Sequence, residues 1–340
     1  MARLGQNPLK WISENDRVED VTVITIVHIP ELSGFWKNSL DVLKVCFNSL
    51  IENTKESFDL IVWDNGSCKE VKDFLKNFHE AGKIQSLIFS GYNLRKIGAL
   101  NHLLNIAPGK YISYADSDVF FKRNWLTESL KILNDFPETG MVSGIPTIDK
   151  MKEFYESTFK GIEKASNLIV DKGDNLIPKE YIDAHRLSIG KTKKEYFNSI
   201  ENRLDIRITR NGLSAFVSAQ DFQFTTTKDV IKKILPLDNF SKDLYYDPIY
   251  SPVFESKIND LGYWRLSTSK YLIHHIGNNL DKLNEELELT SQGRYKLKSN
   301  HSETVPEKRS KMKIRLYRHP LVRRSLKSIY SKIYKLLYEI

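Results

Sequence analysis

The sequence is poor in cysteine, with only Cys46 and Cys68 among 340 residues. Two cysteines are too few for a disulfide framework or a four-ligand zinc site, so we expect a reducing compartment. No apolar run reaches membrane-spanning length, and residues 1–30 show no apolar stretch followed by a cleavage signal. We therefore expect a cytoplasmic protein, or one that is peripheral on the cytoplasmic face of a membrane.

Two glycine-rich nucleotide-binding patterns are also absent. No Gly-x-Gly-x-x-Gly follows an expected strand, which disfavours a dehydrogenase, and there is no P-loop. The composition that is present, 41% hydrophobic and 28% charged residues, is that of a folded protein. The length allows one large domain or two ordinary ones.

Short apolar segments alternate with helical patterns in the first half of the chain. The expected strands are 21–27, 58–63, 84–89, 111–115 and 141–145, and the expected helices are 40–51, 69–80, 96–106 and 124–135. This alternation predicts an α/β fold with a doubly wound, mostly parallel sheet and helices on both faces. Ligands of such sheets bind beyond the carboxyl ends of the strands.

Two carboxylates follow the expected strand at 111–115. Asp116 and Asp118 stand two positions apart, so they point the same way if the chain stays extended, and they repel each other unless a cation lies between them. Oxygen ligands of this kind favour Mg²⁺ or Mn²⁺, which complete their shells with water and phosphate. The stretch predicts a metal–diphosphate site; a plain turn is the alternative interpretation of the same three residues.

The pattern loosens after residue 150. Residues 150–205 are polar, lysine-rich and expected to be helical; alternation returns at 215–226, a helix is expected near Lys228, another at 253–260 and a strand at 271–276. We divide the chain into an N-terminal segment (1–17), a first half of alternating strands and helices (18–150), a helical insertion (151–210), a second half in which strands return (211–280) and a basic tail (281–340).

From residue 18 to 279 the order of these pieces resembles the family 2 glycosyltransferases of GT-A fold. The matching pieces are the first strand, Trp63-Asp-Asn-Gly-Ser67, Asn93 with Gly98 to Asn101, Ala107-Pro-Gly-Lys-Tyr-Ile112 leading into Asp116-Ser-Asp118, Asn259-Asp-Leu-Gly-Tyr263 and His275-Ile-Gly-Asn278. The resemblance implies transfer of a sugar from a nucleoside-diphosphate sugar, with the leaving diphosphate neutralised by a divalent ion. It also implies inversion, with a nucleotide-sugar-binding half at 18–150, an insertion at 151–210 that covers the acceptor side, and an acceptor and catalytic half at 211–280.

The resemblance assigns roles to individual residues. Asp118 would ligate the metal, Asp116 would lie nearer the ribose or sugar, and His275 would be a third ligand. An imidazole ligand favours Mn²⁺ over Mg²⁺. One of the adjacent His274 and His275 is alternatively a structural strand residue.

Asp64 resembles the acid that binds the nucleotide base, which favours UDP; an Asx-turn with Asn65 and Gly66 is its other interpretation. Arg95 and Lys96 would reach the diphosphate, unless they are a solvated surface pair. The remaining positions assigned to donor binding are Asn65, Ser67, Asn93 and Asn101.

An inverting transfer needs a carboxylate that deprotonates the acceptor hydroxyl. Asp247 of Tyr246-Asp-Pro248 stands at the corresponding place, although Tyr246 replaces the first acid of the usual pair. Asp243 and Asp221 are the reserve candidates. A helix N-cap is the alternative role for each.

The charge of the chain is concentrated at its end. Residues 307–340 hold eleven Lys or Arg and two acids, a balance of +9, which leaves the remainder near neutral at −1. Apolar residues recur at helical spacing from Val322 to Leu337, which predicts an amphipathic helix on an anionic membrane and suits a saccharide or lipid-linked saccharide acceptor in surface polysaccharide synthesis. Packing on the body and a homo-oligomer contact are the alternatives. A neutral body disfavours nucleic acid.

Two other functions compete with glycosyl transfer. A nucleotidyltransferase of similar sheet topology would carry a Gly-rich basic loop after the first strand, where this chain has His28-Ile-Pro-Glu-Leu32. A non-catalytic sugar- or lipid-binding scaffold would be expected to lose Asp116 and Asp118, and both are present.

Overall fold

A computed structural model describes residues 18–147, 155–197, 204–237, 253–278, 280, 287–289 and 295–297. The chain divides into two compact units, Met1–Lys296 and Leu297–Ile340. The elements that form the site all lie in the first unit. Residues 298–340, which include most of the basic tail, lie outside the described residues. Within the described part of the chain, no helix combines the length and apolar character needed to cross a membrane.

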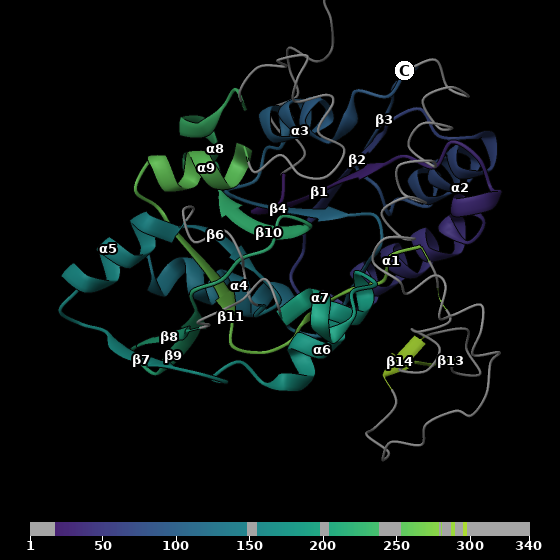
Figure 1. The fold of residues 1–340 in the computed structure, drawn as a ribbon. Coiled ribbons are helices and arrows are strands. Elements are labelled where there is room, and N and C mark those ends of the chain that lie inside the picture. The colour runs from purple at the N-terminus through teal and green to yellow at the C-terminus, as the bar shows by residue number, and fades with distance from the viewer. Residues whose placement is uncertain are drawn as a thin grey trace, which may run out of the picture. The chain divides into compact units, whose positions relative to one another are not determined.

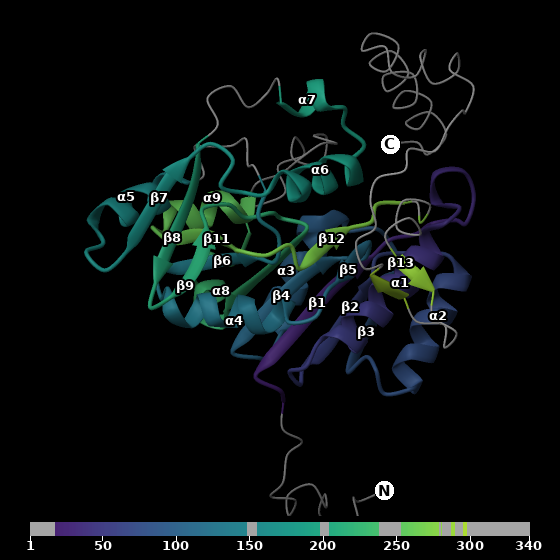
Figure 2. The ribbon, with the colours of Figure 1, turned by 90° about the horizontal axis from the view of Figure 1, so that it is seen from below.

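A mixed sheet of ten strands forms the centre of the first unit, in the order β3-β2-β1-β4-β10-β6-β11-β9-β8-β7 (Figures 1 and 2). The run β3 (Ser86–Phe89), β2 (Asp59–Asp64), β1 (Val21–Val27) and β4 (Tyr111–Asp116) is parallel throughout. β10 (Gln223–Thr227) is antiparallel to both β4 and β6 (Thr139–Ser143), and β11 (Trp264–Thr268) is parallel to β6. The predicted α/β fold with parallel strands at its centre is confirmed.

Three more strands extend the sheet beyond β11. These are β9 (Leu213–Phe216), β8 (Asp205–Arg210) and β7 (Ile169–Gly173), and each is antiparallel to the strand before it in the sheet order. Two small ribbons stand apart from the main sheet: β5 (Val119–Phe121) pairs with β12 (Ile273–His275), and β13 (Leu287–Leu289) pairs with β14 (Tyr295–Leu297).

Helices cover both faces of the sheet because successive strand residues point to opposite sides. Val23 and Val27 of β1 pack with α1 (Ser39–Asn53), α2 (Lys69–Glu80) and α4 (Trp125–Asp135), whereas the intervening Ile24 packs with α3 (Arg95–Ile106), α8 (Lys228–Ile234) and α9 (Val253–Asp260). Figure 1 shows α3, α8 and α9 gathered on one side of the sheet. A short 3₁₀ turn, η2 (Gly34–Trp36), precedes α1.

The region expected to be helical after residue 150 contains α5 (Glu156–Lys164), α6 (Lys179–Ser188) and α7 (Lys193–Phe197), but also the unexpected strand β7. β7 is the last strand of the sheet, and its sequence is Ile-Val-Asp-Lys-Gly. Ile169 is 66% exposed, so this polar edge strand shows no alternation of apolar residues that would predict it. Its Asp171 pairs with Arg207 of β8 at 2.8 Å.

Candidate active site

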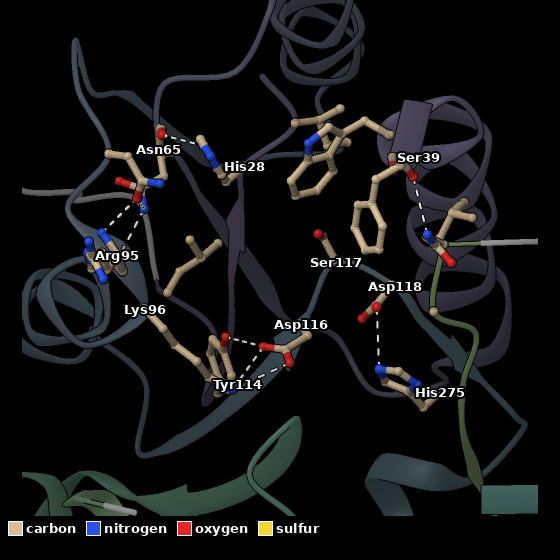
Figure 3. A pocket seen from close by; sticks show the side chains of 18 residues that line it. His28, Ser39, Asn65, Arg95, Lys96, Tyr114, Asp116, Ser117, Asp118 and His275 are labelled. Carbon is tan, nitrogen blue, oxygen red and sulfur yellow. Dashed lines mark hydrogen bonds and ion pairs between the residues drawn. The ribbon is translucent and has the colours of Figure 1, made fainter. Parts of the chain in front are cut away.

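The β5–β12 ribbon brings two distant parts of the chain together at the end of β4. β4 ends at Asp116, the chain turns at Ser117 and Asp118, and β5 then pairs with β12 so that His275 lies opposite Val119. The Ile276 N–H donates to the Asp118 carbonyl at 2.8 Å, which fixes this register. As a result the Asp118 Oδ2 and His275 Nε2 atoms lie 3.3 Å apart, and Figure 3 shows the two side chains pointing at one another.

These residues line a cavity of about 520 Å³ at the carboxyl ends of β1, β2 and β4. Most of the predicted site residues meet there. The cavity lining includes Asn65, Asn93, Arg95, Lys96, Asp116, Asp118 and His275. This is the edge of the sheet at which the sequence predicted a ligand.

Lys96 holds two carboxylates together on one side of the cavity. Its Nζ lies 3.1 Å from Asp116 Oδ1 and 3.1 Å from Asp221 Oδ2, and 5.1 Å from the centre of the Tyr114 ring. The Tyr114 hydroxyl donates to Asp116. Burial raises the pKa of Asp116, with Lys96 opposing and Asp118 and Asp221 adding to the shift. Burial alone would lower the pKa of Lys96, but its interactions with Asp116, Tyr114 and Asp221 together outweigh burial and hold that pKa well above its ordinary value.

Asp118 and His275 form the second charged pair. Burial alone would lower the pKa of His275, but the carboxylate of Asp118 raises it. The other ring nitrogen, Nδ1, is buried without a hydrogen-bond partner. The neighbouring His274 instead faces Tyr271, whose hydroxyl lies 2.6 Å from its Nδ1. The two histidines therefore have different surroundings, and His275 is the one at the cavity.

The donor set at Asp118 and His275 fits a divalent cation in part. One carboxylate oxygen and one imidazole nitrogen already face each other, and this mixed set suits Mn²⁺. Asp116 is engaged by Lys96 and Tyr114, so it does not join them as a ligand in this arrangement. The described residues hold no group of three or more His, Cys, Asp or Glu at metal-binding spacing. Such an ion would need phosphate and water to complete its shell.

The end of β2 is organised by hydrogen bonds. Asp64 is fully buried, and its carboxylate accepts from the Ser67 N–H at 3.1 Å, while the Ser67 hydroxyl accepts from the Ile29 N–H at 3.0 Å. Asn65 faces the cavity; its Nδ2 donates to Asn93 Oδ1 at 2.7 Å and its Oδ1 accepts from the Leu94 N–H at 2.7 Å. In this structure Asp64 fixes the turn, and Asn65 lies at the cavity.

Besides Asp64 and Ser67, two predicted residues of the described chain are absent from the cavity lining, Asn101 and Asp221. Asn101 bonds through both amide atoms to the backbone of Leu237, with its Oδ1 2.8 Å from the nitrogen and its Nδ2 3.2 Å from the oxygen. Asp221 is held by Lys96 behind Asp116. The other two base candidates, Asp243 and Asp247, lie outside the described residues.

Sequence reasoning missed an aromatic wall of the cavity. It consists of His28, Phe35 and Trp36, with the Trp36 ring edge-on to Phe35 at 5.0 Å and to His28 at 5.9 Å between ring centres. His28 Nδ1 lies 2.9 Å from the Asn65 carbonyl oxygen. Because His28 directly follows the expected first strand, its position in the sequence could have placed it at this edge of the sheet. Nothing in the local pattern marks the 3₁₀ turn that brings Phe35 and Trp36 to the same wall.

An α/β sheet with carboxylates at its strand ends, beside a cavity of this size, is typical of doubly wound proteins that bind a ligand at this edge of the sheet. Residues 36–193, a little under half of the chain, match the model of glycosyl transferase family 2. The mixed, mostly parallel sheet with helices on both faces is consistent with the GT-A fold.

Known proteins resemble only part of this chain. An uncharacterized glycosyltransferase of Rickettsia bellii (strain RML369-C) is 28% identical over 113 residues, which are 33% of this chain and 16% of that protein. Mannosyltransferase PcManGT from Pyrobaculum calidifontis, solved with GDP-Man and Mn²⁺, is 20% identical over 40% of each chain, with a TM-score of 0.32. S. aureus TarS 1-349 with UDP-GlcNAc is 16% identical over 38% of this chain and 35% of that one, with a TM-score of 0.31.

Proposed function

We propose that this protein is a metal-dependent glycosyltransferase that moves a sugar, with inversion, from a nucleoside-diphosphate sugar to a saccharide or lipid-linked saccharide. The observation that carries the proposal is the 3.3 Å approach of Asp118 and His275 in a cavity at the carboxyl ends of the parallel strands, within a chain that matches the family 2 model. A cavity of about 520 Å³ is in the usual range for a small-molecule site.

In this proposal Asp118 and His275 hold Mn²⁺ or Mg²⁺, which would neutralise the charge of the leaving diphosphate. The protein's own groups supply the rest. Lys96 keeps Asp116 ionised despite its burial, and the Tyr114 hydroxyl fixes that carboxylate for contact with the ribose or sugar. Asn65 and Asn93 border the cavity at the end of β2, where the nucleoside would lie.

The acceptor base is proposed from the sequence. Asp247 is the first candidate and Asp243 the next. Asp221 is the weakest of the three, because its carboxylate is already paired with Lys96 at 3.1 Å. UDP is the favoured nucleotide because Asp64 resembles the base-binding acid of the family; the buried Asp64 lies next to Asn65, which borders the cavity.

Calorimetric titration of the full chain with UDP, GDP, dTDP and CDP, each in Mn²⁺ and in EDTA, tests the donor class. We expect one nucleotide to bind more tightly with Mn²⁺, and Asp118→Ala to remove that difference while the protein stays folded. Asp229→Ala, which removes an exposed carboxylate on α8, serves as the control and should bind like the wild type. Equal binding in Mn²⁺ and EDTA would contradict a metal role for Asp118.

The basic tail is proposed to contact an anionic membrane from the cytoplasmic side, which would place the enzyme near a lipid-linked acceptor. Co-sedimentation of the full chain with phosphatidylglycerol vesicles should fall at high salt and in a variant with Arg323, Arg324 and Lys327 changed to Gln. Binding that ignores both salt and these substitutions would favour packing of the tail on the body or a homo-oligomer.

A further inference from the structure

The two nitrogens of the His275 ring have different surroundings. Nε2 faces Asp118 at 3.3 Å, whereas Nδ1 is buried and has no hydrogen-bond partner within the described part of the chain. A histidine that ligates a metal usually donates its second ring N–H to a carboxylate, a carbonyl or water, and this bond fixes the orientation of the ring. The contact that orients the His275 ring must therefore be of another kind.

Aromatic rings surround His275 on the side away from the cavity. The Phe222 ring lies edge-on to the His275 ring, with 5.2 Å between the ring centres and 63° between the planes. Phe222 in turn stacks on His185 of α6, at 6.1 Å and 16°. Phe222 and His185 are both buried. Stacked and edge-on arrangements at these separations are the ones that aromatic pairs prefer. The rings of His185, Phe222 and His275 thus form a series of contacts from α6 to the cavity.

The outer end of this ring series is anchored in the insertion. His185 Nδ1 lies 3.1 Å from the hydroxyl of the buried Tyr196 on α7. α6 also lies beside β12 (Figure 2), and its Tyr181 ring packs on Tyr271 with 5.4 Å between ring centres. The helix therefore contacts both the Phe222 ring and the segment that leads into the strand of His275.

The backbone of Phe222 contacts the other side of the site. β10 runs antiparallel to β4 with Gln223 opposite Ala115, and one position further along the Asp116 N–H donates to the Phe222 carbonyl at 2.8 Å. The ring of Phe222 is held at His275, and its main chain is held at the end of β4. One residue outside the cavity lining thus connects the strand end at Asp116 with the imidazole of His275.

We propose that Phe222 is a positioning residue of this site: its ring, backed by His185, fixes the His275 imidazole against Asp118 in place of a hydrogen bond at Nδ1. The inference rests on the proposed metal role of His275 and deepens it. It also gives the insertion a function, because α6 supplies His185. Neither Phe222 nor His185 lines the cavity, so both act through His275.

Phe222→Leu tests the ring, because leucine is apolar and buried easily but has no flat face. Supporting residues of metal ligands typically change metal affinity by a factor of 10 or more, so we expect Mn²⁺ to bind roughly tenfold more weakly. The measurement is a titration of the full chain with Mn²⁺, alone and with UDP, followed by the electron paramagnetic resonance signal of the free ion. The melting temperature should fall by about 2–4 °C.

Phe74→Leu is the matched control. It removes a ring on α2 that packs on Phe78 with 4.7 Å between ring centres, away from the cavity lining. It should lower the melting temperature by a similar amount and leave Mn²⁺ binding unchanged. Equal Mn²⁺ affinities of Phe222→Leu and Phe74→Leu would make Phe222 an ordinary core residue and overturn the inference.

Two substitutions of His185 test the stack without changing Phe222. His185→Phe and His185→Leu both lose the contact with the Tyr196 hydroxyl, but only phenylalanine keeps a ring against Phe222. We expect His185→Phe to bind Mn²⁺ within twofold of the wild type and His185→Leu to bind it several-fold more weakly. The same affinity in both variants would contradict the support of Phe222 by His185. This pair also tests the ring series if Phe222→Leu does not fold.

Nitrogen-15 NMR of the His275 ring without metal separates this inference from the proposed function. A ring held in one orientation gives one sharp set of signals, and we expect these signals to broaden in Phe222→Leu. If the wild type binds Mn²⁺, His275→Ala loses it and Phe222→Leu keeps both the affinity and the sharp signals, only the inference fails. If the wild type binds no Mn²⁺ but the signals broaden in Phe222→Leu, the metal proposal fails and the positioning role of Phe222 stands. No Mn²⁺ binding and unchanged signals would refute both.

Discussion

Replacement of Asn101 by alanine tests whether a residue outside the cavity controls turnover. Asn101 lies on α3 and makes two hydrogen bonds to the backbone of Leu237. Leu237 lies three residues after the end of α8. Leu237 is 1% exposed, so its N–H and C=O have little access to water. Asp243 and Asp247, the proposed bases, follow Leu237 in the sequence. The contact therefore anchors the chain just before them.

The size of the effect follows from the groups left behind. A buried backbone donor or acceptor without a partner costs about 1–3 kcal/mol, and the Asn101→Ala variant leaves one of each on Leu237. Asn101 itself is half-buried, so water can enter and recover part of this loss. We expect the free energy of unfolding to fall by about 2–3 kcal/mol. Asn101→Asp keeps the acceptor and loses the donor, so its free energy of unfolding should lie between those of the wild type and Asn101→Ala.

Urea unfolding measures the stability, and steady-state kinetics with calorimetry separates kcat from donor affinity. We expect kcat to fall at least tenfold in Asn101→Ala, because the proposed bases Asp243 and Asp247 follow Leu237 in the sequence. The Kd for the nucleoside diphosphate should change less than threefold. Asn105→Ala, an exposed asparagine one turn further along α3, is the matched control and should change neither quantity. A large rise in Kd with unchanged kcat would refute the anchoring role and favour direct donor binding by Asn101.

Three further substitutions test the packing, the electrostatics and the chemistry. Gly161→Ala would put a Cβ 2.1 Å from Nε1 of the buried Trp264, so unfolding should become easier by about 1–3 kcal/mol in urea titrations. Burial alone would raise the pKa of Glu138, but the hydrogen bond and the charge of Arg210 outweigh burial and lower it. The ion pair therefore stabilises the folded state above pH 4.5, and this stabilisation is lost as the pH falls through the lowered pKa. Because Glu138 is 40% exposed, Glu138→Gln should cost only about 0.5–1 kcal/mol at pH 7, and less as the pH falls from 4.5 through the lowered pKa. Asp247→Asn should keep donor binding and lower turnover by a factor of about 10²–10⁴.

Each of these has a matched control or a contrary outcome. Gly173→Ala introduces a methyl group whose nearest neighbour is 3.9 Å away, so it should not reproduce the Gly161→Ala effect. A Glu138→Gln deficit that is the same at pH 3 and pH 7 would mean that the ion pair with Arg210 contributes nothing. Near wild-type turnover in Asp247→Asn would exclude Asp247 as the base and leave Asp243 to be tested.

The parallel part of the fold was accessible from sequence because its strands carry continuous apolar runs. In β1, six of seven residues are buried, and the run Val-Thr-Val-Ile-Thr-Ile-Val reports that burial directly. The place of Asp116 and Asp118 at this edge was also accessible, since both follow an expected strand, whereas only the family resemblance placed His275 beside them. β11 was not, because its five buried residues include Arg265, Ser267 and Thr268. Arg265 is buried against the Tyr155 ring at 4.3 Å, a contact that no local pattern contains.

Asp64 is a residue whose role at the site could not be decided from the sequence. The sequence favours both a turn-forming and a base-binding acid, and it offers no means to rank them. In the structure, Asp64 bonds to the Ser67 N–H from a fully buried position, while Asn65, next in the chain, faces the cavity. Neighbouring residues at a strand end point to opposite sides, so the acid that fixes the turn also orients the amide beside it. In the proposed function, recognition of the base at this edge would therefore depend on Asp64 through Asn65, without a contact between the Asp64 carboxylate and the ligand.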